Sequence, residues 1–258
     1  MNLLLSEYRK LTYSRSNWAL LIAAVAFTVF GTAISPLAIQ ATEPLIGIGL
    51  ESQEIVDSVY ANAISGYFFA IIIGILLMAN EFRHGTAVAT FLSRPNRARV
   101  LLAKFVLAAL SGAFLMVLSA LAAIAVTAPV LTLFANAAQP SDGIFADLLL
   151  ASLLSGVVLG VVGVALAALV RSQVIAIVGS LVYLFLIDPI LVAVAPDIGR
   201  WLPSGLITAM LSLDISAAEL GIDTTKFFEP WPAALLLCAY AAVFAIAALA
   251  TSMRRDID

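Results

Sequence analysis

Six long apolar stretches, separated by short polar connections, dominate the pattern of this chain. A helix rises about 1.5 Å per residue and the hydrocarbon core of a bilayer is about 30 Å thick, so a spanning helix needs roughly 20 apolar residues. The stretches that reach this length are 17–39, 59–79, 101–127, 148–170, 174–195 and 231–252. The pattern predicts an all-α polytopic membrane protein with six transmembrane helices, folded as a single transmembrane domain over residues 1–258.

The composition supports this class. Of the 258 residues, 63% are hydrophobic and 11% are charged, and the mean hydropathy is +1.09. A water-soluble domain is nearer half apolar and about a quarter charged, so a soluble globular enzyme is excluded. The net charge of −3 provides no basic excess for nucleic acid. The one cysteine, Cys238, lies in an apolar run and predicts a buried small side chain, with no disulfide or thiolate metal cluster.

The basic residues fall on alternate connections, and positively charged connections stay in the cytoplasm. Of the 13 Lys and Arg residues, only Arg200 and Lys226 lie on the side opposite the two termini. Both termini are therefore expected in the cytoplasm. The outer segment 196–230 contains an apolar stretch at 202–213 that is too short to cross, which predicts short re-entrant or interfacial helices there.

The connection between the second and third spans, residues 80–99, has the pattern of a short cytoplasmic helix. Gly85 lets the chain turn out of the span, Thr86 can cap the next helix, and Pro95 ends it. One apolar face is formed by Val88, Phe91 and Leu92. Such a helix, ringed by arginines, suits docking into a groove of a soluble partner. The alternative is a membrane-surface loop whose arginines meet lipid phosphates.

Residues 1–16 predict an amphipathic helix that lies along the membrane surface before the first span. Leu4, Tyr8 and Leu11 share one helical face. Ser6 and Lys10 lie on the opposite face, as an interfacial helix requires.

Two of these segments resemble the ABC transporter type 2 permeases. The first motif comprises Glu81, Phe82, Arg83, His84, Gly85 and Thr86, continued by 90–95, which includes Arg94, and by a basic run up to Lys104. In that family this segment is the coupling helix that receives the motion of the ATPase. The second motif, with Glu7, Tyr8, Arg9 and Lys10, is similar to the family's amphipathic connecting helix before span one.

The resemblance extends over the whole chain in span count, topology and the outer segment, where the family places short re-entrant helices. It implies a permease in a bacterial cell membrane that forms a homodimer, or a heterodimer with a sister permease. Two cytoplasmic ABC ATPase subunits would bind it. ATP and Mg²⁺ would lie on those subunits, so this chain needs no cofactor and no metal of its own. The resemblance does not indicate the substrate.

Features missing from the sequence agree with a transport subunit that is not itself an enzyme. No segment matches the G-x-x-x-x-G-K-[ST] phosphate loop, and no lysine follows a glycine-rich loop. Another polypeptide must therefore handle ATP. The single histidine, His84, lies in a connection, which excludes the Ser-His dyad of an intramembrane protease and a multi-histidine metal site.

Two acidic side chains have more than one interpretation. Asp188 is the one acidic residue well inside a span, where charge is costly and usually faces a cavity or a partner, as a substrate-path or gate residue would. Alternatively, Asp188 is hydrated near the outer interface or caps the helix restarted by Pro189. Glu81 would pair with Arg83 or a basic group of the partner, or extend to water.

The fourth span carries small residues at four-residue spacing, which let helix backbones approach closely. They are Ser152, Gly156 and Gly160, followed by Gly163 and Ala167. The spacing does not distinguish packing within one chain from packing between two chains. We expect packing within the chain.

These features together predict the membrane subunit of an ATP-driven exporter. Its cargo would be amphipathic or hydrophobic, such as a drug, peptide or lipid-like molecule, because the spans offer many apolar side chains and few fixed charges. Movement of 86–94 by the ATPase would tilt spans two and five and open an outward path. The alternatives are an ion-coupled secondary transporter or channel, which would need charged or polar midplane residues, and a non-transporting accessory subunit.

Overall fold

The computed structural model describes residues 3–46, 49–83, 97–211 and 227–254, and these residues form helices with no strand. The helices are α1 (Leu3–Tyr13), α2 (Arg15–Ile46), α3 (Gln53–Ala61), η1 (Asn62–Ile64), α4 (Tyr67–Arg83), α6 (Arg97–Leu131), α7 (Ile144–Val170), α8 (Gln173–Val182), η2 (Tyr183–Ile187), α9 (Asp188–Val194), α10 (Pro196–Gly199), α11 (Pro203–Met210) and α12 (Pro230–Arg254). Within these ranges six helical stretches are long and apolar enough to cross a membrane. The prediction of an all-α protein with six spans is confirmed.

The spans follow the predicted stretches; the first four are longer than predicted, and the last two have the predicted length and are shifted by one residue. The six spans are Arg15–Pro44, Gln53–Glu81, Ala98–Leu131, Ile144–Val170, Gln173–Val194 and Pro230–Thr251. The second span is interrupted by the short helix η1, and the fifth contains the π-helical turn η2. Pro189 explains that turn, because proline has no N–H and its ring crowds the carbonyl four residues earlier, which widens the helix.

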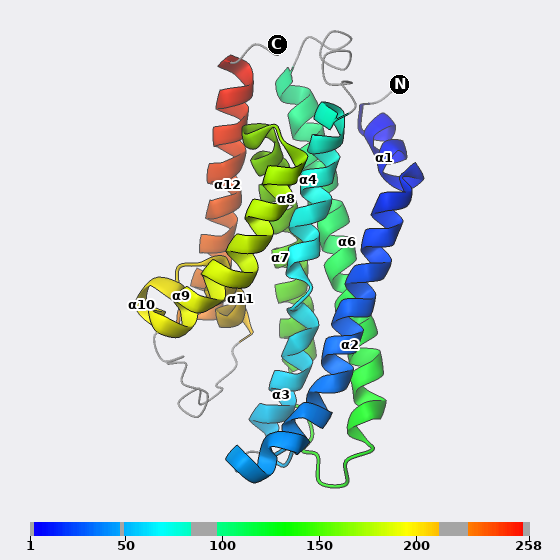
Figure 1. Ribbon diagram of the computed structural model, residues 1–258, viewed down its shortest axis with the longest axis vertical. Coiled ribbons are helices and arrows are strands. Elements are labelled where there is room, and N and C mark those ends of the chain that lie inside the picture. Colours follow the sequence, from blue (N-terminus) through cyan, green and yellow to red (C-terminus); the bar gives the residue numbers. More distant parts are fainter. Residues whose placement is uncertain (1–2, 47–48, 84–96, 212–226, 255–258) are drawn as a thin grey trace.

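The helices form an elongated bundle in which α7 contacts α4, α6 and α12 (Figure 1). Helix α1, the end of α4, the start of α6 and the last turns of α12 lie together at one end of the bundle, and α3 lies at the other (Figure 1). The predicted alternation of the connections agrees with this arrangement. That the α1 end faces the cytoplasm stays a prediction.

Small residues let α7 approach its neighbours at backbone distance. A Cβ atom added at Gly160 would overlap the Ala108 carbonyl oxygen of α6, and one added at Gly163 would overlap the Ile71 carbonyl oxygen of α4. Gly156 lies in the same way against Gly112 of α6. These contacts of Gly156, Gly160 and Gly163 are all within one chain.

Short helices α10 and α11 lie in the outer segment, where re-entrant or interfacial helices were expected. Helix α11 buries Leu206 and Ile207 and packs against α12, α9 and α7. Tyr240 of α12 donates a hydrogen bond from its hydroxyl to the Trp201 carbonyl oxygen at 2.7 Å, which ties this segment to the sixth span. Residues 212–226 lie outside the described part of the chain.

The prediction that Cys238 is buried is wrong, because Cys238 is exposed on the surface of α12. The outward face of this span also carries Leu235 and Val243, which are largely exposed. An apolar run in a membrane helix satisfies the bilayer as well as a protein core, so apolarity alone does not indicate burial inside the bundle.

Candidate functional site

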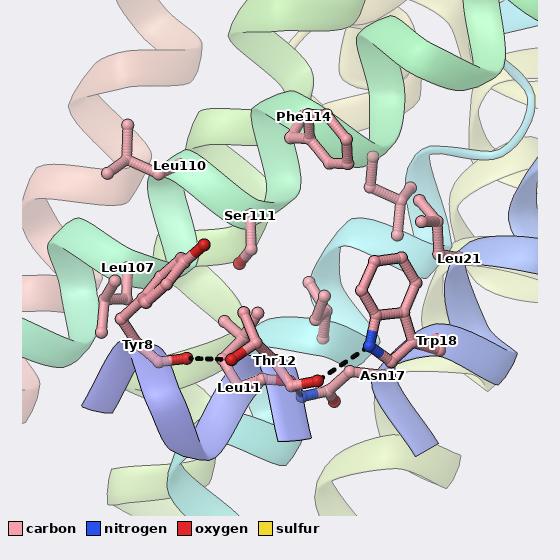
Figure 2. A pocket seen from close by; sticks show the side chains of 12 residues that line it. Tyr8, Leu11, Thr12, Asn17, Trp18, Leu21, Leu107, Leu110, Ser111 and Phe114 are labelled. Carbon is pink, nitrogen blue, oxygen red and sulfur yellow. Dashed lines mark hydrogen bonds between the residues drawn. The ribbon is translucent and has the colours of Figure 1, made fainter. Parts of the chain in front are cut away.

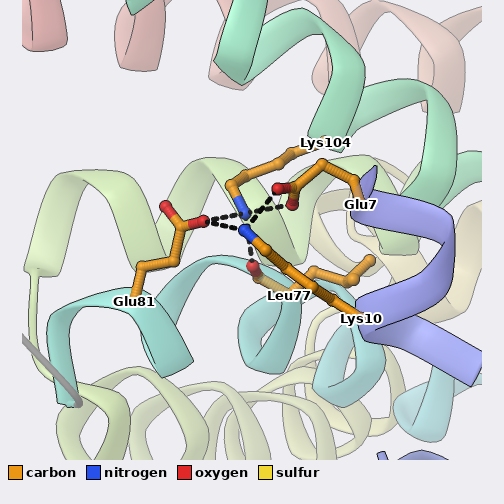
Figure 3. A network of polar contacts seen from close by, with 5 residues as sticks. All are labelled: Glu7, Lys10, Leu77, Glu81 and Lys104. Atoms are coloured by element: carbon orange, nitrogen blue, oxygen red, sulfur yellow. Dashed lines mark hydrogen bonds and ion pairs between the residues drawn. The ribbon is translucent and has the colours of Figure 1, made fainter. Parts of the chain in front are cut away.

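Four charged side chains meet where α1, α4 and α6 converge (Figure 3). Glu7 and Lys10 come from α1, Glu81 from the last turn of α4, and Lys104 from α6. We call these four residues the ionic cluster. The three helices that supply its members are separated along the chain, so the complete cluster exists only because these helices pack together.

Lys104 is the centre of the ionic cluster, and its side chain is only 1% exposed. Its Nζ donates to Glu7 Oε2 at 2.7 Å and to the Leu77 carbonyl oxygen at 3.0 Å. The same Nζ lies 2.9 Å from Glu81 Oε1. The ammonium group of Lys104 thus has two hydrogen bonds and ion pairs with two carboxylates, and such pairing is the condition under which a charge is tolerated away from water.

Lys10 completes the cluster from the solvent side, with a side chain that is half-exposed. Its Nζ lies 2.5 Å from Glu7 Oε1 and 3.2 Å from Glu81 Oε1. Each carboxylate is therefore shared between two lysines, and the four formal charges cancel. Charge-assisted hydrogen bonds of this kind are about twice as strong as neutral ones.

The cluster shifts the titration of the two α1 residues. Burial alone would raise the pKa of Glu7, but the charge of Lys104 and the hydrogen bonds from Lys10 and Lys104 outweigh it, and the pKa falls below its usual value. Burial alone would lower the pKa of Lys10, but its hydrogen bond and charge interaction with Glu7, and its interactions with Glu81, raise it. Both groups are held in their charged forms.

Local structure explains how α1 comes to present these residues. Glu7 and Lys10 are three apart and so share one helical face. Helix α1 ends at Tyr13, and side chains from the next helix take up its last carbonyls: Asn17 Nδ2 donates to the Leu11 oxygen at 2.9 Å and Trp18 Nε1 donates to the Thr12 oxygen at 2.8 Å. The corner between α1 and α2 is thereby held, with Glu7 turned into the bundle.

Of the sequence interpretations of Glu81, extension to water is wrong, whereas pairing with Arg83 or with a basic group of the partner stays a prediction. Glu81 is 5% exposed, so it does not extend to water, and its oxygen contacts Lys10 and Lys104. Lys104 was not identified as a site residue. The signal was present, because a lysine inside a predicted span needs a counter-charge, but its spacing from Glu7 gave no indication of which acid would supply it.

The remaining residues of the two motifs fall into three groups. Tyr8 and Arg9 are exposed on α1. Phe82 and Arg83 end α4, and their side chains are not described. His84, Gly85, Thr86, Val88, Phe91, Leu92 and Arg94 lie outside the described residues. The described chain ends at Arg83 and resumes at Arg97, so the predicted coupling segment joins the two helices that meet in the ionic cluster.

Asp188 forms a second polar contact at the other half of the bundle. It is fully buried, and its Oδ1 and Oδ2 accept hydrogen bonds from Ser204 Oγ at 2.6 Å and Ser204 N at 3.1 Å. The carboxylate is therefore shielded from solvent. It accepts hydrogen bonds from the first turn of α11 and does not cap the helix restarted by Pro189. Negative charge at a helix N-terminus is favourable, so Asp188 joins the fifth span to the outer segment.

An apolar cleft of about 580 Å³ lies beside α7, between α8 and α12. Its walls include Leu159, Val162 and Leu237, and its few polar side chains include Ser180, Tyr183 and Tyr240. The volume falls within the range of about 300–1,000 Å³ that is typical of small-molecule sites. Such a cleft accommodates an apolar molecule with one or two hydrogen-bonding groups.

A family model described as ABC-2 family transporter protein matches residues 3–187. This range contains all four members of the ionic cluster and ends one residue before Asp188. No curated protein matches the chain.

Proposed function

Because the chain belongs to the ABC-2 transporter family of membrane proteins, we propose that it is the permease subunit of an ATP-driven exporter. A separate pair of cytoplasmic ATPase subunits would bind ATP and Mg²⁺ and supply the energy. The permease would work as a homodimer or beside a sister permease. Its orientation would place α1 and both termini in the cytoplasm.

The ionic cluster carries this proposal. It locks α1 to the last turn of α4 and to α6, the two helices that flank residues 84–96. A force applied to that segment would therefore move the ends of three helices together instead of bending one connection. Rigid coupling of this kind is what a permease needs where its ATPase docks, and Val88, Phe91 and Leu92 would form the docking face.

The cargo proposed is an amphipathic or hydrophobic compound. The apolar cleft beside α7 supports this, because it combines hydrocarbon walls with the hydroxyls of Tyr183 and Tyr240. Movement of α4 and α8 would change the shape of this cleft, since Ile71 of α4 and Ile175 of α8 both line it.

The test is co-purification. The tagged chain is expressed with its chromosomal neighbours, extracted in mild detergent, and its partners are identified by mass spectrometry and assayed for ATP hydrolysis. We expect a phosphate-loop ATPase in one-to-one ratio, lost in Phe91→Arg and retained in Asn96→Arg, which adds the same charge outside the docking face.

Other results would contradict the proposal in distinct ways. If Phe91→Arg kept the ATPase and exported normally, residues 86–94 would not be the docking helix. If the chain purified alone and no ATP was hydrolysed, an ion-coupled transporter or an accessory subunit would become the better interpretation. Asp188 would then be the first residue to examine for ion coupling.

A further inference from the structure

The apolar cleft beside α7 reaches into the bundle, which distinguishes it from a groove on the lipid-facing surface. Its walls include Leu159, Leu184 and Leu237, each at most 3% exposed. By contrast, a groove of about 350 Å³ between α1, α2 and α6 is lined by Tyr8 and Trp18, which are both more than half exposed (Figure 2). Contact with the acyl chains of the bilayer accounts for that groove, whereas the cleft offers a partly enclosed surface to a ligand.

Aromatic side chains form one part of the wall of the apolar cleft. They are Tyr183 of η2, Trp201 of the outer segment, and Tyr240 and Phe244 of α12. The face of an aromatic ring carries partial negative charge, so it attracts a cation in addition to contributing apolar area. None of the described residues that line the cleft carries a charge of its own. Such walls suit a cation whose charge is spread over an apolar body.

A buried carboxylate lies beside this aromatic wall. Asp188 follows Tyr183 by five positions on the fifth span and is fully buried. Its charge acts on the Tyr183 hydroxyl, and the two hydrogen bonds donated by Ser204 stabilise its ionised form. No described lysine or arginine forms an ion pair with it. A carboxylate without a counter-ion produces a negative potential that extends over several ångströms in a low-dielectric interior.

Arg200 is a cation at the outer end of the cleft, but its contacts are with aromatic rings. Its guanidinium carbon lies 5.7 Å from the centroid of the Trp201 ring and 5.4 Å from that of Phe228. Arg200 does not line the cleft. It therefore leaves the carboxylate of Asp188 without a direct counter-ion, and its contact with Trp201 is an example of the interaction that the aromatic wall offers to a cation.

We propose that the apolar cleft binds a hydrophobic cation, with its apolar groups against α7 and its positive charge beside Tyr183. The faces of the aromatic rings and the potential of Asp188 both favour a cation over an anion of the same shape. Asp188 would act through its electrostatic field and not by contact, since its side chain is fully buried. The proposal rests on the proposed function, because it names the class of cargo that the exporter would carry.

The test compares two ions of the same shape and opposite charge, tetraphenylphosphonium and tetraphenylborate. The purified chain is placed in phosphatidylcholine nanodiscs, and binding is measured by equilibrium dialysis after subtraction of the binding to empty nanodiscs. We expect saturable binding of one tetraphenylphosphonium per chain and no saturable binding of tetraphenylborate. Equal saturable binding of the two ions, or saturable binding of neither, would overturn the proposal.

The source of the charge preference is tested with two aspartate substitutions. Asp188→Asn removes the charge and keeps an oxygen that can accept a hydrogen bond from Ser204. Asp57→Asn is the matched control, because Asp57 is also buried and accepts a hydrogen bond from Ser141 N at 2.9 Å, but lies on α3, which does not line the cleft. We expect the affinity for tetraphenylphosphonium to fall about three- to tenfold in Asp188→Asn and to be unchanged in Asp57→Asn. Equal affinities in the two variants would overturn the role of Asp188.

The position of the bound ion is tested with two glycine substitutions. A Cβ atom added at Gly179, which lines the cleft, or at Gly31 of α2, which does not, meets no atom within 4 Å. Gly179→Phe should therefore fill the cleft and abolish binding, and Gly31→Phe should leave binding unchanged. Retained binding in Gly179→Phe would locate the ion elsewhere and overturn the proposal. None of these measurements uses the ATPase, so their failure is distinct from failure of the co-purification test.

Discussion

Lys104 Nζ lies 2.7 Å from Glu7 Oε2, although 97 positions separate the two residues in the chain. Their side chains are only 1% and 3% exposed. A buried charge is tolerated only when it is paired, so the contact between Lys104 and Glu7 helps to fix α1 against α6. The contribution of the ionic cluster to stability can therefore be measured by mutating its members.

Replacing Lys104 by methionine should destabilise the protein by about 3–5 kcal/mol, because it leaves buried carboxylates with too little positive charge. Thermal unfolding of the detergent-solubilised protein measures the loss. Lys10→Met is the matched control, and its effect should be smaller because Lys10 is half-exposed. Equal losses in the two variants would argue against a central role for Lys104.

Combining Lys104→Met with Glu7→Gln should restore part of the lost stability, because the double variant removes one buried charge of each sign. Residues in direct contact typically show coupling energies of about 0.5–3 kcal/mol. A double-mutant cycle on the unfolding free energy measures this term. Strict additivity of the two single effects would mean that Lys104 and Glu7 are not energetically coupled.

The cluster should stabilise the fold across neutral pH and lose its effect at both extremes. The pKa of Glu7 is lowered on folding, so its stabilisation is present above the ordinary value of 4.5 and is lost as the pH falls through the lower folded value. The pKa of Lys10 is raised, so its stabilisation is present below 10.5 and is lost as the pH rises through the higher folded value. Melting temperatures of the unmodified chain and of Glu7→Gln should therefore converge in acid. A constant difference from neutral pH into acid would exclude this linkage.

Gly160→Ala should destabilise the bundle by about 1–3 kcal/mol, because the new Cβ would overlap the Ala108 carbonyl oxygen and push α6 from α7. Gly179→Ala is the control, since a Cβ at Gly179 meets no atom within 4 Å. In a helix that substitution should be neutral or stabilising by up to about 1 kcal/mol. Melting temperatures in the same detergent compare the two, and a similar loss in both would show that backbone approach at Gly160 is not the cause.

Asp188→Ala should cost more stability than Ser204→Ala. The first substitution removes both hydrogen bonds at the start of α11, and the second leaves the one from the backbone N–H. Losing a hydrogen bond to a charged group costs about 1.5–3 kcal/mol. Unfolding of the two variants gives the order. If Asp188→Asn also exports normally at every pH, Asp188 serves structure and takes no part in the transport path.

The sequence predicted parts of the ionic cluster but not its connections. Glu7, Lys10 and Glu81 belong to motifs that are recognisable along the chain, and each was assigned to its own segment. Lys104 was noted only as one basic residue among several beside a span. Which acid meets which lysine depends on the distance and rotation between α1, α4 and α6, and these are not local properties of any segment.

What the sequence determined by itself is the set of six spans and the succession of their connections. Runs of roughly 20 apolar residues and the placement of Lys and Arg are local properties. Each apolar run partitions into the bilayer by its own length and hydrophobicity, and the basic residues beside it bias its orientation. The tertiary structure alone decided three further features: the enclosure of Lys104 between Glu7 and Glu81, the hydrogen bonds from Ser204 to Asp188, and the apolar cleft beside α7. Each of these requires a particular approach of helices that are distant in the chain, and such approaches are set by close packing at positions such as Gly160, where a single added carbon would prevent them.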